Sequence, residues 1–200
     1  PGARMNSDSD QEAAANLVRY YRWLRAYGLN DSHSGNASCR IGEEIWITPT
    51  GCCADTLSES DLIRVSISAL APEGASLDAN LHLAVYRHVP EAMAVLHSHG
   101  PCSIAMTMSG EDFAAVDFEG RLYFGTVPVL DIPHAAYTEQ SPEKVARILR
   151  EHRVAIVRGH GVYARGRSLD QAYKWTCSLE SSARIAWLTR TAGIPTGETS

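Results

Sequence analysis

Three histidines at two distant places in the chain constrain its fold more than any other feature. His97 and His99 lie one residue apart, and His160 follows 61 residues after His99, between two glycines. Residues 93–99 have the composition of a strand, in which positions i and i+2 point to the same face, so both rings can reach one ion from a stiff backbone. His160 follows the apolar run 154–157, which predicts a second buried strand. A fold that brings these two strand ends together unites the three rings.

Such a cluster suits a divalent metal. Three neutral imidazole nitrogens and one open position are typical of a catalytic zinc, whereas a structural zinc is more often closed by four ligands, many of them thiolates. A single core histidine is more often a hydrogen-bonded structural residue. Spacing alone therefore leaves both interpretations open.

The composition indicates one globular domain and argues against two classes of partner. The 200 residues, 44% of them hydrophobic and 20% charged, suffice for one domain with a sizeable core. The net charge of −5, without a cluster of Lys or Arg, argues against nucleic acid. No segment approaches the roughly 18 apolar residues of a membrane span, and residues 1–10 lack the apolar core of a signal peptide. We therefore expect a cytoplasmic protein with no membrane partner.

The cysteines form neither a zinc-type Cys-x-x-Cys pair nor an evident disulfide framework. They are scattered along the chain as Cys39, Cys52, Cys53, Cys102 and Cys177. We expect reduced and mostly packed thiols.

Periodicity and capping patterns predict helices around a sheet of short, mixed strands. Helices are expected over 9–27, where Ser9 begins a capping box, over 78–88, 101–108 and 141–151, where Pro142 occupies the first position, and from Ser168 onwards. Strands are expected over 36–41, 44–48, 93–99, 122–130 and 154–157. These elements predict a single α/β layered domain over 9–192, with loose termini at 1–8 and 193–200.

Five motifs in a shared order resemble the class II aldolase/adducin family, from about residue 12 to about residue 190. They are Ser34–Ser38 (Ser-Gly-Asn-Ala-Ser), Ile47–Gly51 (Ile-Thr-Pro-Thr-Gly), His82–Tyr86, the His97–His99 pair and Gly159–Gly161. The resemblance implies an α/β fold with a central mixed, mainly antiparallel sheet flanked by helices, and a homotetramer with active sites at subunit interfaces. It also implies that His97, His99 and His160 bind Zn²⁺, or Mn²⁺, Co²⁺ or Fe²⁺ in its place.

The family's catalytic carboxylate, usually Glu, corresponds to Asp78 here. Without the resemblance, Asp78 is typical of a first-turn acid favoured by the helix dipole. In the family register, this shorter side chain is expected to serve mainly as a metal ligand or a fixed base. His82, one helical turn further on, is expected to pack or hydrogen-bond rather than bind metal.

A phosphate-binding loop is also implied by the resemblance. The matching positions are Gly35, Asn36, Thr50, Gly51 and Ser76. Such loops bind through backbone and hydroxyl donors and need no lysine, although each pattern alone is more typical of an ordinary turn. Leu77 replaces a serine common in the sugar-phosphate aldolases, and His33 replaces a frequent threonine. Losing a buried hydroxyl donor weakens phosphate binding by roughly 1 to 3 kcal/mol, so a different anionic group, or none, remains an alternative.

The resemblance implies a zinc-dependent aldehyde-lyase that cleaves a ketose or ketose phosphate, such as a fuculose 1-phosphate-like sugar, through a metal-stabilised enediolate. Asp78 would manage the proton at the enediolate carbon, and Asp117, Tyr123 and Tyr137 are candidates for the second proton-transfer residue. The alternatives within the family are a sugar-phosphate 4-epimerase, which often carries Asp at this position, and a decarboxylase or dehydratase acting on a non-phosphorylated substrate. A non-catalytic binding module like the adducin head domain is the alternative from another class, and the retained histidines favour an enzyme over it.

Overall fold

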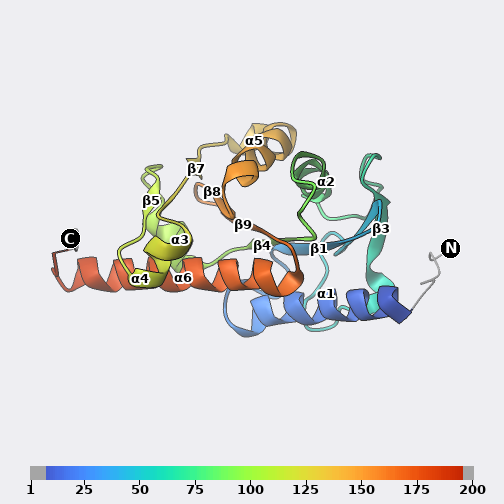
Figure 1. Cartoon of the computed structure of the whole chain (residues 1–200), viewed down its shortest axis with the longest axis horizontal. Coiled ribbons are helices and arrows are strands. Elements are labelled where there is room, and N and C mark those ends of the chain that lie inside the picture. The colour runs from blue at the N-terminus through green and yellow to red at the C-terminus, as the bar shows by residue number, and fades with distance from the viewer. Residues whose placement is uncertain (1–7, 196–200) are drawn as a thin grey trace.

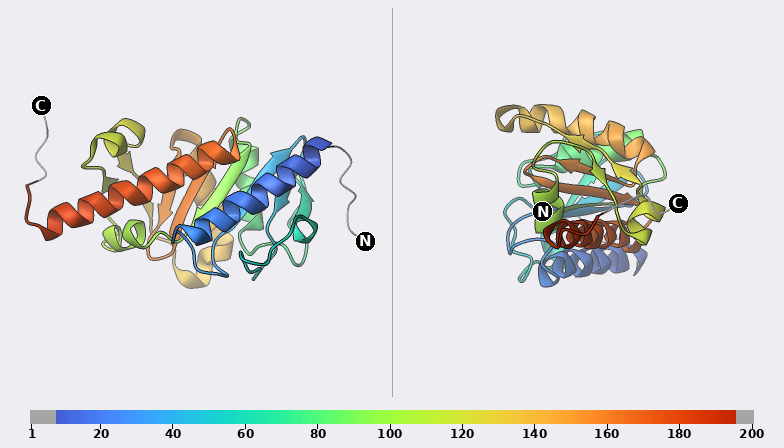
Figure 2. Two further views of the ribbon diagram at one scale, coloured as in Figure 1. Left: turned by 90° about the horizontal axis from the view of Figure 1, so that it is seen from below. Right: turned by 90° about the vertical axis from the view of Figure 1, so that its left-hand side faces the viewer.

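A seven-stranded sheet forms the middle layer of the fold, between two layers of helices (Figures 1 and 2). The computed structural model describes residues 8–195. Its helices are α1 (Asp8–Ala26), α2 (Ala79–His88), α3 (Pro101–Met106), α4 (Phe118–Tyr123), α5 (Tyr137–Glu151) and α6 (Leu169–Thr191), with short 3₁₀ turns η1 (Glu59–Asp61) and η2 (His134–Ala136). Its strands are β1 (Asn36–Ile41), β2 (Glu44–Ile47), β3 (Ile63–Ser66), β4 (Ala94–Ser98), β5 (Phe113–Ala114), β6 (Thr126–Val127), β7 (Val129–Leu130), β8 (Val154–Val157) and β9 (Gly161–Gly166).

The main sheet has the order β3-β2-β1-β4-β9-β8-β7, and β5 and β6 form a separate pair. Within the main sheet β7 and β8 are parallel, and all other neighbours are antiparallel. The expected mixed, mainly antiparallel sheet is therefore confirmed. β4 and β9, which are far apart in the sequence, are neighbours at the centre, and this pairing brings the two histidine segments together.

The central strand β4 shows why the sheet needs cover on both faces. Val95 packs with residues of α2 and α5, whereas Ala94 and Leu96 pack with residues of α1 and the start of α6. Successive side chains of a strand point to opposite faces, so both must be apolar when both faces are covered. His97 lies two residues after Val95 in the same strand, so its side chain points to the same face of the sheet, toward α2 and α5. Figure 2 shows α1 and α6 together on one side of the sheet and α5 on the other.

The long helix α6 agrees with its sequence pattern. Residues at helical spacing form a stripe that is buried along its length: Leu169, Ala172, Thr176, Leu179, Ala183 and Ala186. The hydroxyl of Ser168 accepts the Gln171 N–H at 3.1 Å and caps the helix. The spacing of Ser168 and Gln171 matches a capping box, but the Gln171 side chain accepts the N–H of Arg167 instead.

The predicted start of α5 is wrong. The helix begins at Tyr137, so Pro142 lies inside it rather than at its first position. Proline removes one backbone hydrogen bond within a helix. The buried Tyr137 side chain, which packs in the core and bonds to Asp78, offsets this loss. This contact between distant residues cannot be predicted from local sequence preferences.

Two other expected elements also differ. Residues 122–130 are not one extended segment, because α4 continues to Tyr123 and only β6 and β7 follow. The Asp117 carboxylate accepts the Gly120 N–H and starts this short helix. Ser9 lies inside α1, which already includes Asp8, so Ser9 does not cap it.

The ends of the chain are only partly described. Residues 1–7 and 196–200, which belong to the termini expected to be loose, lie outside the described residues. None of the helices within 8–195 combines the length and apolarity needed to cross a membrane. All five cysteines are free thiols, as expected.

Candidate metal centre

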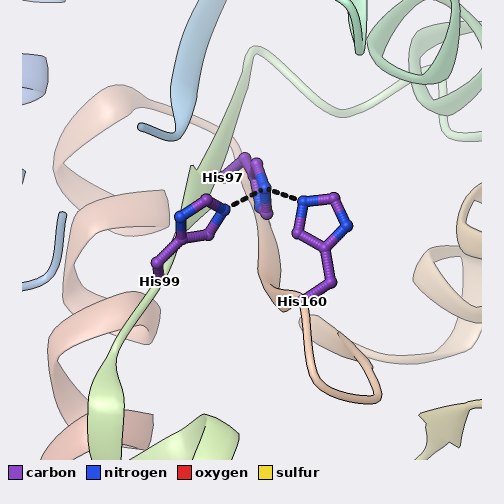
Figure 3. A group of neighbouring side chains, drawn as sticks. All are labelled: His97, His99 and His160. Carbon is purple, nitrogen blue, oxygen red and sulfur yellow. Dashed lines mark hydrogen bonds between the residues drawn. The ribbon is translucent and has the colours of Figure 1, made fainter. Parts of the chain in front are cut away.

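The three histidines meet at one end of the β4–β9 pair (Figure 3). His97 is the last but one residue of β4 and is 1% exposed. His99 follows the strand, and its backbone N–H donates to Leu29 O at 2.7 Å and Asn30 Oδ1 at 2.9 Å, which fixes the chain after β4. His160 lies in the turn between β8 and β9. The Nε2 atom of His97 lies 2.9 Å from that of His99 and 3.1 Å from that of His160.

Gly161 makes this close approach of the rings possible. A Cβ atom there would overlap Ser98 O and would lie 2.7 Å from His99 Cδ2 and 2.8 Å from His97 Cε1. Any other residue would push the β8–β9 turn away from the end of β4. The glycine beside His160 therefore serves the packing of the histidines, and the other, Gly159, has the positive φ of 66° that the turn requires.

The geometry and protonation of the rings fit a divalent cation. One nitrogen from each ring can be chosen so that all three lie within 4.8 Å of one another. Tetrahedral zinc, with Zn–N bonds of about 2.0 to 2.1 Å, spaces its nitrogen ligands about 3.3 Å apart. His97 Nδ1 donates to Val162 O at 3.0 Å, which leaves the lone pair of its Nε2 facing the other two rings. Three lone pairs that converge on one point are the chemistry expected of a metal site.

Burial keeps these imidazoles neutral. It lowers the pKa of His97 well below its ordinary value, and it also lowers the pKa values of His99 and His160. Neutral histidine is the form that binds metal.

Asp78 lies beside the cluster and is held by three donors. It precedes α2, but its side chain makes no capping bond to that helix. Its Oδ1 accepts the Tyr137 hydroxyl at 2.8 Å, and its Oδ2 accepts the Asn36 amide at 2.9 Å and the Tyr163 hydroxyl at 2.8 Å. Asp78 Oδ2 is 3.7 Å from His97 Nε2. The structure therefore places this carboxylate in a buried polar network rather than at an exposed first turn.

This network keeps Asp78 ionised. Burial raises its pKa, but its polar surroundings, including the hydrogen bonds donated by Asn36 and Tyr137, lower the pKa below its ordinary value. Burial and the adjacent carboxylate raise the pKa values of Tyr137 and Tyr163, so both hydroxyls remain protonated donors. The site is therefore an anion next to three neutral imidazoles, an arrangement suited to a cation.

Tyr163 was not expected from the sequence. It lies directly opposite His97 in the β4–β9 register. Their rings stack with centroids 4.1 Å apart and planes 2° apart, and the Tyr163 side chain is fully buried. One residue thus contacts both a candidate metal ligand and the carboxylate. No sequence signal marks it, because a tyrosine in an apolar strand is ordinarily a packing residue.

His82 has the hydrogen-bonding environment expected of it. Its Nδ1 lies 2.7 Å from the Ser38 hydroxyl, which in turn lies 2.8 Å from the Tyr86 hydroxyl. The ring is fully buried, and burial lowers its pKa to about 4. His82 therefore belongs to a polar network with Ser38 and Tyr86.

The expected substrate-binding residues surround one cavity of about 220 Å³ that also touches the histidines. Gly35, Asn36, Thr50, Gly51 and Ser76 all line it, with His33, Leu77 and Asp78. No Lys or Arg side chain of the described chain lines it. Two of the expected donors are already engaged, since the Asn36 amide binds Asp78 and the Thr50 N–H donates to Gly74 O at 2.9 Å. Apart from Asp78 and the histidines, the polar groups of this wall include the hydroxyls of Thr50 and Ser76.

The three candidates for second proton-transfer residue lie in different places. Tyr137 contacts Asp78 and lines a second cavity at the cluster. Asp117 caps α4 and accepts a hydrogen bond from the Ser182 hydroxyl. Tyr123 packs against Trp175, with ring centroids 5.4 Å apart. Neither Asp117 nor Tyr123 lines either cavity at the histidines, so of these three candidates it is Tyr137 that lies at the site.

Comparisons with known proteins agree with this architecture. A family model described as Class II Aldolase and Adducin N-terminal domain matches residues 15–187. The L-fuculose phosphate aldolase of Methanocaldococcus jannaschii is 27% identical over 155 residues, which cover 77% of this chain and 84% of that protein. The methylthioribulose-1-phosphate dehydratase of Methylococcus capsulatus is 31% identical over 198 residues, covering 88% and 93%. Among solved structures, the L-fuculose-1-phosphate aldolase of Thermus thermophilus is 33% identical with a TM-score of 0.85, covering 92% of this chain and 96% of that one.

Proposed function

The chain belongs to the class II aldolase and adducin family, and on that premise we propose that it is a metal-dependent aldolase that cleaves a ketose phosphate. The observation that carries the proposal is the convergence of three neutral imidazoles beside an ionised carboxylate, on the wall of a cavity. A purely structural domain would have no need of these three rings around one point. L-Fuculose 1-phosphate is one sugar of the class we propose, because related proteins are named for it.

We assign His97, His99 and His160 as the metal ligands and Zn²⁺ as the metal, with Mn²⁺, Co²⁺ or Fe²⁺ as alternatives. A bound divalent ion supplies Lewis-acid stabilisation of the negative charge that develops on substrate oxygens when the carbon–carbon bond breaks. The bond from His97 Nδ1 to Val162 O orients that ring, and the Asp78 Oδ2 atom, 3.7 Å from His97 Nε2, would place negative charge beside a bound cation.

The smaller cavity would bind the anionic end of the substrate. The hydroxyls of Thr50 and Ser76 and the backbone amide of Gly51 can donate to phosphate oxygens without a lysine. Gly35 supports this arrangement, because a Cβ there would overlap the Asn30 side chain and His97 O. Asn36 would act indirectly, since its amide holds Asp78.

Asp78 and Tyr137 form a connected pair that can move one proton. In the cleavage, the substrate hydroxyl on the carbon that becomes the aldehyde gives its proton to the Tyr137 oxygen, while Tyr137 gives its own proton to Asp78 Oδ1. The electron pair of the broken carbon–carbon bond stays on the enediolate. Asp78 then returns the proton to the enediolate carbon, which balances the reaction. The 2.8 Å bond between Tyr137 and Asp78 supports this relay.

A dehydratase is the second candidate. The relative named methylthioribulose-1-phosphate dehydratase is 31% identical and is covered over 93% of its length. Dehydration also begins with proton removal next to a polarised carbonyl, so the same carboxylate and tyrosine can serve it. The two reactions differ in whether a carbon–carbon or a carbon–oxygen bond breaks.

We further propose a homotetramer with active sites at subunit interfaces. Large apolar side chains on α4 and α6 support an interface there: Phe118, Leu122, Trp187 and Leu188 are between 48% and 77% exposed. Light scattering coupled to size-exclusion chromatography measures the mass of the assembly, and a monomeric mass at working concentration would contradict this part of the proposal.

The reaction is tested with the zinc-loaded protein and a panel of ketose 1-phosphates. Release of dihydroxyacetone phosphate and an aldehyde supports the aldolase. Loss of water would instead identify a dehydratase, and formation of a ketose with one inverted centre would identify an epimerase. His160→Ala should abolish turnover, and the matched variant His152→Ala, at a half-buried position outside both cavities, should not. If the wild-type protein holds metal but converts no member of the panel, the proposal is wrong.

A further inference from the structure

Asn30 is a buried polar residue beside the histidines, and the proposed reaction gives it no role. It is 6% exposed and follows α1. After that helix the chain turns at Gly28, whose φ is 72°. The N–H groups of Leu29 and Asn30 both donate to Leu24 O, at 2.8 and 3.1 Å. The end of α1 therefore fixes where the Asn30 side chain lies.

The amide of Asn30 meets the backbone of both members of the histidine pair. Its Oδ1 accepts the His99 N–H at 2.9 Å, and its Nδ2 donates to His97 O at 3.5 Å, a longer and weaker bond. A carboxamide carries an acceptor and a donor in one group. A single side chain therefore spans the two peptide groups on either side of Ser98, the last residue of β4.

The two histidines of the pair differ in how the sheet holds them. His97 is paired on both sides, with Asn36 of β1 and with Tyr163 of β9. His99 lies beyond the end of β4, so its position depends on bonds outside the sheet, to Asn30 Oδ1 and to Leu29 O. Figure 3 shows both rings projecting from this short stretch of chain. A shift of the His99 backbone would therefore move its ring relative to that of His97.

The Asn30 amide also packs against Gly35, in the wall of the smaller cavity. A Cβ atom at Gly35 would overlap both the Asn30 side chain and His97 O. The backbone of the cavity loop thus approaches the amide as closely as a glycine allows. Because close-packed groups transmit displacement, Asn30 connects this loop to the backbone of the histidine pair.

We infer that Asn30 is a positioning residue for the metal site, which holds the His97–His99 backbone at the spacing that a shared ion needs and links it to the loop of Gly35. This inference rests on the proposed function, because it takes the histidines as metal ligands. Asn30 lines neither cavity at the histidines. It therefore acts through the backbone of the ligands and not by contact with the ion or the substrate.

The zinc affinity of Asn30→Ala, measured by competition with a chelator, tests the inference without turnover. The Kd for zinc should rise by about 10- to 100-fold, because the His99 N–H loses one of its two acceptors. Urea unfolding of the metal-free protein measures the loss of stability separately. Asn80→Ala is the matched control, and it should leave the zinc Kd unchanged. The Oδ1 of Asn80 likewise accepts a backbone N–H, that of Ala71 at 3.0 Å, but Asn80 is exposed and lines neither cavity.

Gly35→Ala reaches the same amide from the side of the cavity. The added methyl group must displace the Asn30 side chain or the His97 backbone, so the zinc Kd should rise although Gly35 is not a metal ligand. Gly51→Ala is the matched control for this variant. Gly51 also lines the smaller cavity and has a positive φ, of 62°, but a Cβ atom there would meet nothing within 4 Å. Its replacement should therefore leave the zinc Kd unchanged.

The outcomes separate this inference from the proposed function. A wild-type zinc Kd in Asn30→Ala, even with reduced stability, overturns the inference and leaves the aldolase intact. Weaker zinc binding in Asn30→Ala and Gly35→Ala but not in the controls, without turnover of any ketose phosphate by the wild-type protein, supports the inference and overturns the proposed reaction. If Asn30→Ala does not fold, the glycine variants decide, since equal zinc Kd values in Gly35→Ala and Gly51→Ala overturn the inference. A wild-type protein that binds no zinc overturns both.

Discussion

Replacing Tyr163 by Phe tests whether the buried network around Asp78 serves the reaction or only the fold. Phenylalanine keeps the ring that stacks on His97 at 4.1 Å and removes only the hydroxyl that donates to Asp78 at 2.8 Å. Hydrogen bonds to charged groups contribute about 1.5 to 3 kcal/mol, so the free energy of unfolding should fall by roughly that amount. Because residues that orient a metal site commonly change affinity or activity by about 10- to 100-fold, we expect a kcat loss in that range.

Tyr86→Phe is the matched control for this experiment. Tyr86 is also a buried tyrosine of the same core, but its hydroxyl meets the neutral Ser38 hydroxyl instead of Asp78. Its loss should lower the free energy of unfolding by about 1 kcal/mol and leave kcat within about twofold of the wild-type value. Urea unfolding, steady-state kinetics and zinc competition with a chelator would be measured on both variants. Equal kcat losses in the two variants, or wild-type kcat and zinc affinity in Tyr163→Phe, would refute the reasoning.

Three further predictions address single residues. His82 has a pKa of about 4 in the folded protein and an ordinary value of 6.5, so the unfolded chain binds a proton first on acidification. The folded state therefore loses stability from pH 6.5 down to about pH 4, by about 3 kcal/mol from this group, and urea titrations of the metal-free protein should show a shallower loss in His82→Asn. Asp117→Ala should lower the free energy of unfolding by about 0.5 to 2 kcal/mol through loss of the α4 cap, while kcat per folded protein stays unchanged; a kcat loss beyond tenfold would restore Asp117 as a catalytic candidate. Asp78→Asn turns an amide group toward its three donors, so we expect at least a hundredfold lower kcat, and near-normal turnover would exclude the proton relay.

The fold was predictable where one element determines its own pattern. Helix α6 is buried along one face, so its buried residues recur at helical spacing. Strand β4 is buried along its whole length, so it contains a short apolar run. The start of α5 was not predictable, since it depends on the contact of Tyr137 with Asp78, 59 residues away. Residues 122–130 were misassigned because the cap at Asp117 lies outside that window and was interpreted as a catalytic candidate.

The candidate site was predictable to the extent that residues of like chemistry recur at a fixed spacing. The histidine pair and the glycine-flanked third histidine carry such a signal, and the family resemblance supplied Asp78. Tyr163 carried none, because strand alternation tells which face a residue occupies but not which residue lies opposite it. That information is the β4–β9 register, which pairs His97 with Tyr163 and exists only in the folded chain.

The account depends most on three imidazoles that share one divalent ion. X-ray absorption spectroscopy of the protein loaded with one equivalent of zinc measures this directly, through the number of imidazole ligands and their distance. We predict three imidazole nitrogens at about 2.0 to 2.1 Å, and two in His160→Ala. A protein that does not retain zinc, or an imidazole count that is the same in His160→Ala, would contradict the account.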